Sequence, residues 1–270
     1  MAHFNDGDLH YLVTDSNMEM IIIHRTAEEL FSKTIRRICG PLNLAAAING
    51  NVYDVTASGM MDAFAGHDSV PAKETIPIGL CVESGKVIAG KSEPARFHVS
   101  VQCPINTAPS SACYTFGQGD PPTRGSGLGG LGPLIVARLS FGIGNHYAAG
   151  TPPGAPATGK PGAVHSPFLL QRNNNTYAAM AARGKGVGKM ILAVNRTENM
   201  LLLLAQPHYP ATSAGGMHLD EIRDRLARAG VDDAVFMDGS DSAILWMRGM
   251  FLISQGEDKD ELTTIGLGFR

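Results

Sequence analysis

Two carboxylates stand close together in the stretch "FMDGSDSAILW", residues 236–246, within a turn of small polar residues between two apolar segments. Asp238 and Asp241 are near enough in the chain to act as a pair. Such a pair can supply an acid and a base, or it can bind a hard cation such as calcium. A turn also favours Asp for a simpler reason, because its side chain hydrogen-bonds the nearby main chain. The stretch alone leaves these interpretations open.

Further candidate residues lie in three other stretches of the chain. They are Asn49, Gly50 and Tyr53 in "AAAINGNVYD", Gly132 in "GLGGLGPLIV", and Arg183 and Lys185 in "ARGKGVGKM". Amide and hydroxyl groups can orient a polar substrate, and a cation can bind an anionic group. Taken singly, each has an ordinary alternative: Asn-Gly is a common turn dipeptide, and a loop cation is often simply solvated.

Several familiar motifs fail when their context is examined. "GSGLGG", residues 125–130, fits a dinucleotide-binding pattern, but the following "PLIV" predicts a strand instead of the required helix. "GAPATGKP", residues 154–161, has Pro161 where a P-loop needs a hydroxyl. The nine His residues show no metal-binding spacing, and Ser242 lies in "GSDSA" instead of a nucleophile elbow.

Two helices are predicted from the periodicity of their apolar residues. The first is expected over about 27–39, with Thr26 as N-cap, Glu29 completing a capping box and Gly40-Pro41 as the stop. The second is expected over about 218–229, where Leu219, Ile222 and Leu226 share one face and Gly230 follows.

The remaining pattern predicts strands joined mostly by hairpins. Hairpins are expected in "LHYLVTDSNMEMIIIHRT" around residues 15–17, in "IPIGLCVESGKVIAG" and in "KMILAVNRTENMLLLLAQ", and strands in "NLAAAI", "FHVSVQC", "DDAVFMDG" and "SAILWMRGMFLIS". "GLGGLGPLIVARLS" is interpreted as a glycine-rich turn leading into a strand, and the Pro/Gly-rich loop at 150–163 as a possible lid. The predicted fold class is α+β, a single domain over 1–270 with a mixed, mainly antiparallel sheet.

Composition excludes some classes of function. The 44% hydrophobic and 17% charged residues are typical of a globular protein, and the net charge of -3 gives no basic footprint for nucleic acid. No apolar run approaches the roughly 18 residues of a membrane span. The start, "MAHFNDGDLHYL", lacks the features of a secretory signal, so a cytoplasmic location is expected, with unconventional secretion left open.

Six stretches, taken in order, resemble the phosphodiester glycosidase family. They are "AINGNVY" at 47–53, Pro77-Ile78-Gly79 with Gly85, "GLGPLIV" at 130–136, "ARGKGVGKM", "GGMHLDEIRDRLARAG", and "DGSDS" at 238–242. The resemblance covers residues 9–270 and implies hydrolysis of a sugar from a phosphodiester. One departure is evident: Ser240 and Asp241 stand where the family has glycines, which would allow substrate close to the main chain.

The resemblance implies a role for each candidate residue. Cleavage builds positive charge on the anomeric carbon while the phosphate departs with its negative charge. Asp238 suits a position beside the anomeric carbon or its water, with Asp241 as a second carboxylate or a fellow ligand of a cation. Arg183 or Lys185 would bind the phosphate. Asn49, Tyr53 and Ser242 would orient the sugar, and Gly50, Gly132, Gly239 and Ser240 would line the substrate site.

Three hypotheses about function follow. The leading one is a hydrolase that cleaves the glycosyl-phosphate bond of an N-acetylglucosamine-1-phosphodiester-like substrate, either a small molecule or a glycoconjugate. The second is a non-catalytic module that binds carbohydrate or phosphate, suggested by the altered glycines. The third is a metal-dependent phosphodiesterase that uses Asp238 and Asp241.

Overall fold

The computed structural model describes the chain outside residues 16–17, 51–52, 56–74, 95, 103–112, 142–170, 173–174, 177–184, 210–214, 240–241, 255–259 and 261. The Pro/Gly-rich loop at 150–163 therefore lies outside the described residues, as do three of the predicted site residues, Arg183, Ser240 and Asp241.

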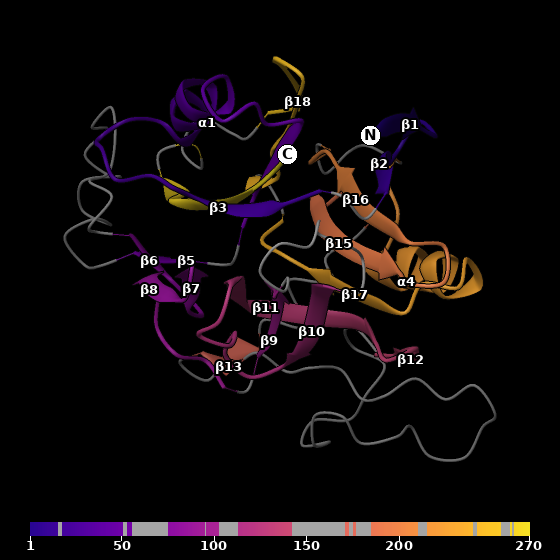
Figure 1. Ribbon diagram of the computed structural model, residues 1–270. Helices are drawn as coiled ribbons and strands as arrows, with labels where there is room; N and C mark the ends of the chain where they lie inside the picture. The colour runs from indigo at the N-terminus through magenta and orange to yellow at the C-terminus, as the bar shows by residue number, and fades with distance from the viewer. Residues whose placement is uncertain are drawn as a thin grey trace.

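Most of the strands belong to two antiparallel sheets (Figure 1). The path through the eleven-stranded sheet is β1 (Ala2–Asn5), β2 (His10–Asp15), β16 (Met200–Gln206), β15 (Lys189–Asn195), β17 (Asp233–Phe236), β11 (Ser126–Val136), β7 (Cys81–Glu83) and β8 (Lys86–Ala89). Off this path lie β9 (Phe97–Val101), β10 (Tyr114–Gln118) and β12 (Leu139–Ser140). The five-stranded sheet has the order β19 (Met250–Ile253), β18 (Leu245–Met247), β4 (Ala46–Asn49), β20 (Ile265–Phe269) and β3 (Met20–His24).

Two short pairs of strands complete the described sheet structure. They are β5 (Tyr53–Val55) with β6 (Thr75–Pro77), and β13 (Gln171–Arg172) with β14 (Asn175–Thr176). Every pairing between named strands of the described chain is antiparallel, so the expected mixed sheet is in fact antiparallel there. The predicted α+β class holds in the coarser sense that, in the part of the chain that the structure describes, the helices α1 and α4 accompany a fold dominated by strands.

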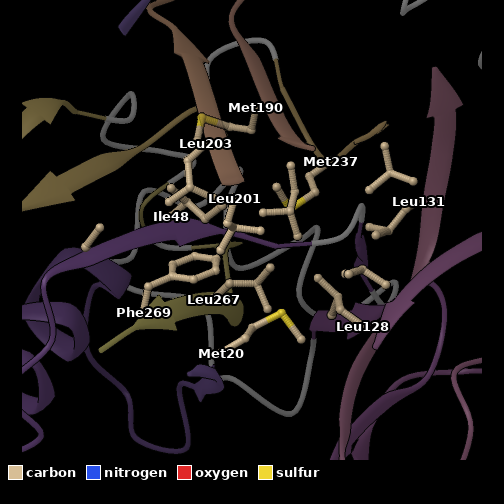
Figure 2. Packing of buried hydrophobic residues seen from close by; sticks show 14 of the residues in the cluster. Met20, Ile48, Leu128, Leu131, Met190, Leu201, Leu203, Met237, Leu267 and Phe269 are labelled. Atoms are coloured by element: carbon tan, nitrogen blue, oxygen red, sulfur yellow. The ribbon is translucent and has the colours of Figure 1, made fainter. Parts of the chain in front are cut away.

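The main hydrophobic core lies between the two sheets. Side chains alternate across each strand, so every second residue of both sheets points inward. From the larger sheet come Met190, Leu192, Leu201 and Leu203, and from the smaller one Met20, Ile48, Leu267 and Phe269. Figure 2 shows these side chains, Leu192 excepted, converging together with Leu128, Leu131 and Met237. The two sheets thus share one core.

A helix covers the outer face of each sheet. Phe31 and Ile35 of α1 (Phe31–Cys39) pack on Ile23, Ala47 and Trp246 of the smaller sheet. The second helix, α4 (Leu219–Arg228), buries Leu219, Ile222 and Leu226 on the outer face of the larger sheet. The two helices lie on different sides of the molecule (Figure 1). Neither helix is long enough to cross a membrane, and the described residues contain no other candidate span.

The second predicted helix is confirmed, but the start of the first is wrong. Helix α1 begins at Phe31, and its N-cap position is Leu30, so Thr26 does not cap it. Glu29 accepts hydrogen bonds from Thr34 and Arg37 instead. The N–H group of Ser32, in the first turn of the helix, donates at 2.6 Å to the carboxylate of Asp260, which is distant in the sequence. A distant carboxylate has taken the place of the local cap.

Two predictions about strands are also corrected. The two strands β2 and β3 do not pair as the expected hairpin, because β2 belongs to the larger sheet and pairs with β1 and β16, whereas β3 pairs with β20 in the smaller sheet. The glycine-rich stretch before "PLIV" is no turn, because it lies inside the eleven-residue strand β11. The expected hairpins β7–β8 and β15–β16 are confirmed.

Candidate functional site

The chain crosses from the larger sheet to the smaller one immediately after β17. We refer to this connection between β17 and β18 as the crossing. Met237 is still part of the shared core, Asp238 and Gly239 follow, and the chain joins the smaller sheet at β18. At the crossing, the N–H of Asp238 donates to the carbonyl oxygen of Gly50 at 3.0 Å. The end of β4 and the end of β17 therefore touch, although they belong to different sheets. The structure brings together two of the stretches singled out in the sequence.

Asn49 holds this crossing at both ends. Its side-chain Nδ2 donates to the carbonyl oxygen of Asp238 at 2.8 Å, and its Oδ1 accepts from the N–H of Ile244 at 3.1 Å. The residue is 0% exposed, so each of these bonds satisfies a polar group removed from water. The predicted closeness of Asn49 to Asp238 is thus observed, and its amide is bonded to the main chain. A direct contact between Asn49 and a sugar stays a prediction.

The carboxylate of Asp238 lies in a turn and is partly exposed. Its Oδ1 accepts from the N–H of Gly239 at 3.1 Å, and the carbonyl oxygen of Gly239 accepts from the N–H of Ser242 at 3.1 Å. The turn chemistry expected of Asp is therefore present. The main chain and this turn fix the half-buried residue at the crossing. Ser242 is buried.

Gly239 packs directly on the main chain that precedes β15. A Cβ atom at this position would lie 2.4 Å from the carbonyl oxygen of Gly188, so any side chain would push the two segments apart. This contact brings the segment that carries Lys185 next to the Asp238 turn. Lys185 is exposed to solvent. The geometry of Arg183, the other candidate for the basic position, lies outside the described residues.

Gly132 and Gly50 have packing roles in this arrangement. Gly132 lies opposite Phe236 in the pairing of β11 with β17, and a Cβ there would come within 2.0 Å of the Phe236 ring. The space left by Gly132 is therefore filled by a phenyl ring of the protein. Gly50 donates its N–H to the carbonyl oxygen of Ile265 at 2.9 Å, which ties the end of β4 to β20. Tyr53 is half-buried and pairs with Pro77 in the small β5–β6 ladder.

One histidine next to the crossing was not among the candidates predicted from the sequence. His208 lies two residues after the end of β16, and its Nδ1 accepts from the N–H of Gly188 at 3.4 Å. It is exposed, and it contacts the same residue that packs on Gly239. No spacing motif surrounds His208 in the sequence. The only available signal was its position after the second strand of a hairpin, opposite the start of the first.

Burial alters the acid–base behaviour of one group beside the site. Lys189 is 4% exposed, and removal from water lowers the pKa of its ammonium group to about 8, against a smaller opposing effect of Glu221. Among the described residues, no group of three or more His, Cys, Asp or Glu side chains is arranged so that it could hold a metal ion. The Asp238–Asp241 pair falls partly outside them, so binding of calcium there stays a prediction.

A cavity of about 190 Å³ lies elsewhere, beneath α4. Its walls are largely apolar and include Leu202, Leu204 and Leu226, with Tyr11 and Arg225 also lining it. None of the predicted site residues lines this cavity, so it is separate from the crossing.

A scan against protein-family models and a search of curated proteins each found no match. Solved structures do match. The catalytic domain of zebrafish N-acetylglucosamine-1-phosphodiester alpha-N-acetylglucosaminidase, auto-inhibited by its pro-peptide, superposes with a TM-score of 0.55 at 11% identity, covering 99% of this chain and 85% of that one. A putative exported protein from Burkholderia pseudomallei gives a TM-score of 0.56 at 10% identity, covering 97% and 73%.

The likeness is one of fold. At this level of identity, shared architecture does not carry shared chemistry, since one fold hosts many activities. The fold of this chain is thus similar to that of an enzyme domain that acts on a sugar phosphodiester, and its activity has to be argued from the crossing itself.

Proposed function

We propose that this protein hydrolyses the glycosyl-phosphate bond of a sugar-1-phosphodiester of the N-acetylglucosamine type. The observation that carries the proposal is the meeting of Asn49, Asp238 and the segment of Lys185 where the chain crosses between the sheets. The fold shared with a domain that acts on such a substrate supports it.

The chemistry demands a small number of groups. Cleavage passes through a state with positive charge at the anomeric carbon, which a nearby carboxylate stabilises. The phosphate is a good leaving group, so cationic or N–H donors beside it matter more than a strong general acid. Asp238 would face the anomeric carbon or direct its water, and Lys185 would bind the phosphate, with Arg183 as the alternative. His208 lies at the same edge and is a further donor for the phosphate.

The test is sugar release from a panel of glycosyl phosphodiesters over a range of pH, with and without divalent metal. Asp238→Asn keeps an oxygen to accept from Gly239 but loses the charge, so we expect the rate to fall by about 100-fold or more. Asp224→Asn, an exposed position on α4, is the matched control and should retain full activity. If no substrate of the panel is hydrolysed, or if Asp238→Asn releases sugar at an undiminished rate, the proposal is overturned.

The products also separate the alternatives. Hydrolysis at the glycosyl bond releases free sugar and a phosphomonoester. Release of a sugar phosphate, abolished by a chelator, would indicate the metal-dependent phosphodiesterase instead. Ser240 and Asp241 in place of the family's glycines favour a second candidate, a module that binds sugar phosphate without turnover. Stabilisation by N-acetylglucosamine 1-phosphate with no hydrolysis of any substrate would identify that function.

A further inference from the structure

Two buried side chains grip the segment that precedes β15. Lys189 Nζ donates to the carbonyl oxygens of Lys185 and Val187, at 3.0 and 2.6 Å. Gln206 Nε2 donates to the same two oxygens, at 2.6 and 2.8 Å. Each carbonyl therefore accepts from both an ammonium and an amide. We refer to Lys189 and Gln206 together as the carbonyl clamp.

The position of this clamp is costly for the fold. Lys189 is 4% exposed and Gln206 is 0% exposed, and burying an ammonium group opposes folding unless its donors are satisfied. The neighbouring residues on the same face of β15 are Ile191 and Ala193, which pack under α4. A Met or Leu at position 189 would suit those surroundings without any charge to desolvate. The ammonium group therefore needs an explanation beyond packing.

The clamp is itself held in place from a third segment. Gln206 Oε1 accepts from the N–H of Met217 at 2.8 Å, which fixes the direction of the amide. Gly216 has a φ of +91°, and a Cβ there would lie 2.3 Å from the carbonyl oxygen of Lys185 and 2.7 Å from Gln206 Nε2. Because Gly216 leaves this space open, the clamp reaches the carbonyls directly.

The other carbonyls of the gripped segment bind outward. The carbonyl oxygen of Gly186 accepts from the N–H of Tyr209 at 2.8 Å. The carbonyl oxygen of Gly188 is the atom on which Gly239 packs. Inward bonds at Lys185 and Val187 thus alternate with outward contacts at Gly186 and Gly188. Holding the inward pair fixes the surface that the Asp238–Gly239 turn meets.

We propose that Lys189 and Gln206 are positioning residues that hold residues 185–188 against the Asp238–Gly239 turn, so that Lys185 is presented to a phosphate group beside Asp238. The ligand in this proposal rests on the proposed function. The positioning itself rests only on the contacts above, and the two are tested separately below.

Other charged and titratable groups surround the clamp. Glu221 and His218 lie at the start of α4, where the N–H of His218 donates to the Glu221 carboxylate. His208 contacts Gly188 after β16, Asp8 accepts from the N–H of Gly216, and Lys185 belongs to the gripped segment. These groups remain in every Lys189 variant, so the difference in pH dependence between variants reports on Lys189.

Hydrogen exchange tests the positioning without any need for activity. In Lys189→Met, which keeps the length of the side chain but donates nothing, we expect the amides of Gly188 and Tyr209 to exchange about tenfold faster or more, with β15 and β16 unchanged. Lys33→Met, an exposed position on α1, should exchange like the unaltered protein. Unchanged exchange in folded Lys189→Met would overturn the proposal. Should that variant not fold, Gln206→Met removes the other two donors, and the same readout decides.

Binding of N-acetylglucosamine 1-phosphate, measured by calorimetry, tests the link to the site. We expect Lys189→Met to bind about tenfold more weakly at neutral pH, because the phosphate contact is no longer held in place. In the unaltered protein the affinity should fall as the pH passes about 8, where Lys189 loses its charge. Lys189→Arg keeps its charge above this pH and should retain affinity there.

The outcomes distinguish the two proposals. Faster exchange with unaltered affinity and an unaltered pH profile would overturn the link between the clamp and the phosphate site. If the unaltered protein neither binds the sugar phosphate nor cleaves any phosphodiester, the proposed function fails, and with it the assigned ligand. The exchange result then still decides whether the clamp positions the segment.

Discussion

The two ends of β17 both carry acidic residues, yet the protein treats them differently. At the start, Asp232 and Asp233 are buried and bonded to arginines: Arg138 Nε lies 2.5 Å from Asp232 Oδ1, and Arg196 forms an ion pair with Asp233. Main-chain N–H groups of Ala137 and Arg196 donate to the same carboxylates. Burial by itself would raise the pKa of Asp232, but these hydrogen bonds and charges hold it below its ordinary value.

At the other end, the main chain of Asp238 is held by two neighbouring residues. Asn49 and Gly50 bind its carbonyl and N–H groups, and its carboxylate accepts from the adjacent Gly239 N–H while remaining partly exposed. A buried carboxylate bonded to arginine side chains and main-chain N–H groups serves stability. A carboxylate on a half-buried residue whose main chain is fixed is suited to act on a ligand. The comparison predicts that the residues at the start of β17 govern stability and that Asp238, after its end, governs activity.

The largest effect on stability is expected at the start of the strand. Asp233→Ala removes the carboxylate that accepts from Arg196 Nη1 and from the N–H of Ala137, and hydrogen bonds to a charged group contribute about 1.5–3 kcal/mol each, so the free energy of unfolding should fall by about 3 kcal/mol. Urea unfolding measures this. Glu19→Gln, in an exposed pair with Arg270, is the control and should change it by less than about 1 kcal/mol. Equal losses for the two variants would contradict the assignment of Asp233 to stability.

A smaller loss of stability is expected when Asn49, which holds the main chain of Asp238, is replaced. Asn49→Ala removes the partners of the Asp238 carbonyl and the Ile244 N–H, so the free energy of unfolding should fall by about 2 kcal/mol. Activity or ligand binding should be lost as well, because the crossing is no longer held. An Asn49→Ala protein with wild-type affinity for N-acetylglucosamine 1-phosphate would separate Asn49 from the site.

The pH dependence of stability should also distinguish the two ends. The lowered pKa of Asp232 means that its contribution is present at neutral pH and is lost as the pH falls through the folded-state value. Lys189, beside the other end, has a pKa lowered to about 8. Above that pH the unfolded chain binds more protons than the folded one, so stability rises with pH up to the ordinary lysine pKa.

The Lys189 contribution is measured as a difference between variants. From about pH 7.5 to about pH 9, the unaltered protein should gain about 1 kcal/mol of stability relative to Lys189→Met. Urea unfolding of both proteins across this range gives the value. Parallel pH profiles for the two proteins would mean that the ammonium of Lys189 is not desolvated in the folded state.

The smallest effect on stability is expected at Asp238 itself. Asp238→Asn retains the oxygen that accepts from Gly239 and leaves the main-chain bonds of the crossing intact, so the free energy of unfolding should change by less than about 0.5 kcal/mol. The same variant should lose sugar release. A loss of stability as large as that of Asp233→Ala would remove the contrast between the two ends.

Elements set by local signals could be predicted from the sequence. Helix α4 and the β15–β16 hairpin follow from apolar periodicity and nearby stop signals, and both were found within a residue or two of their expected limits. The error at the first helix has a non-local cause, because Asp260 supplies the cap of Ser32 from a segment that no local pattern connects to it. Likewise, β2 and β3 are adjacent in the chain but pair with strands from the far end.

The site could be predicted in part. The meeting of Asn49 with Asp238 was expected only through the family resemblance, since each residue alone fits an ordinary turn. Gly132 was expected to line a substrate site, yet the ring of Phe236 occupies the space beside it. Lys189 and Gln206 were not predicted as site residues, because polar residues at strand ends usually face water. Their burial depends on how α4 and the Gly216 segment cover them.

The crossing also sets the order of events when the chain folds. Asn49 and Asp238 are separated by 189 positions, and Gly50 is tied to Ile265 in the last strand. Contacts between such distant residues close large loops and form late. A nascent chain therefore cannot assemble this surface until β20 has been synthesised and inserted between β3 and β4. A chain that ends before β20 would then lack this surface and would not act on a ligand.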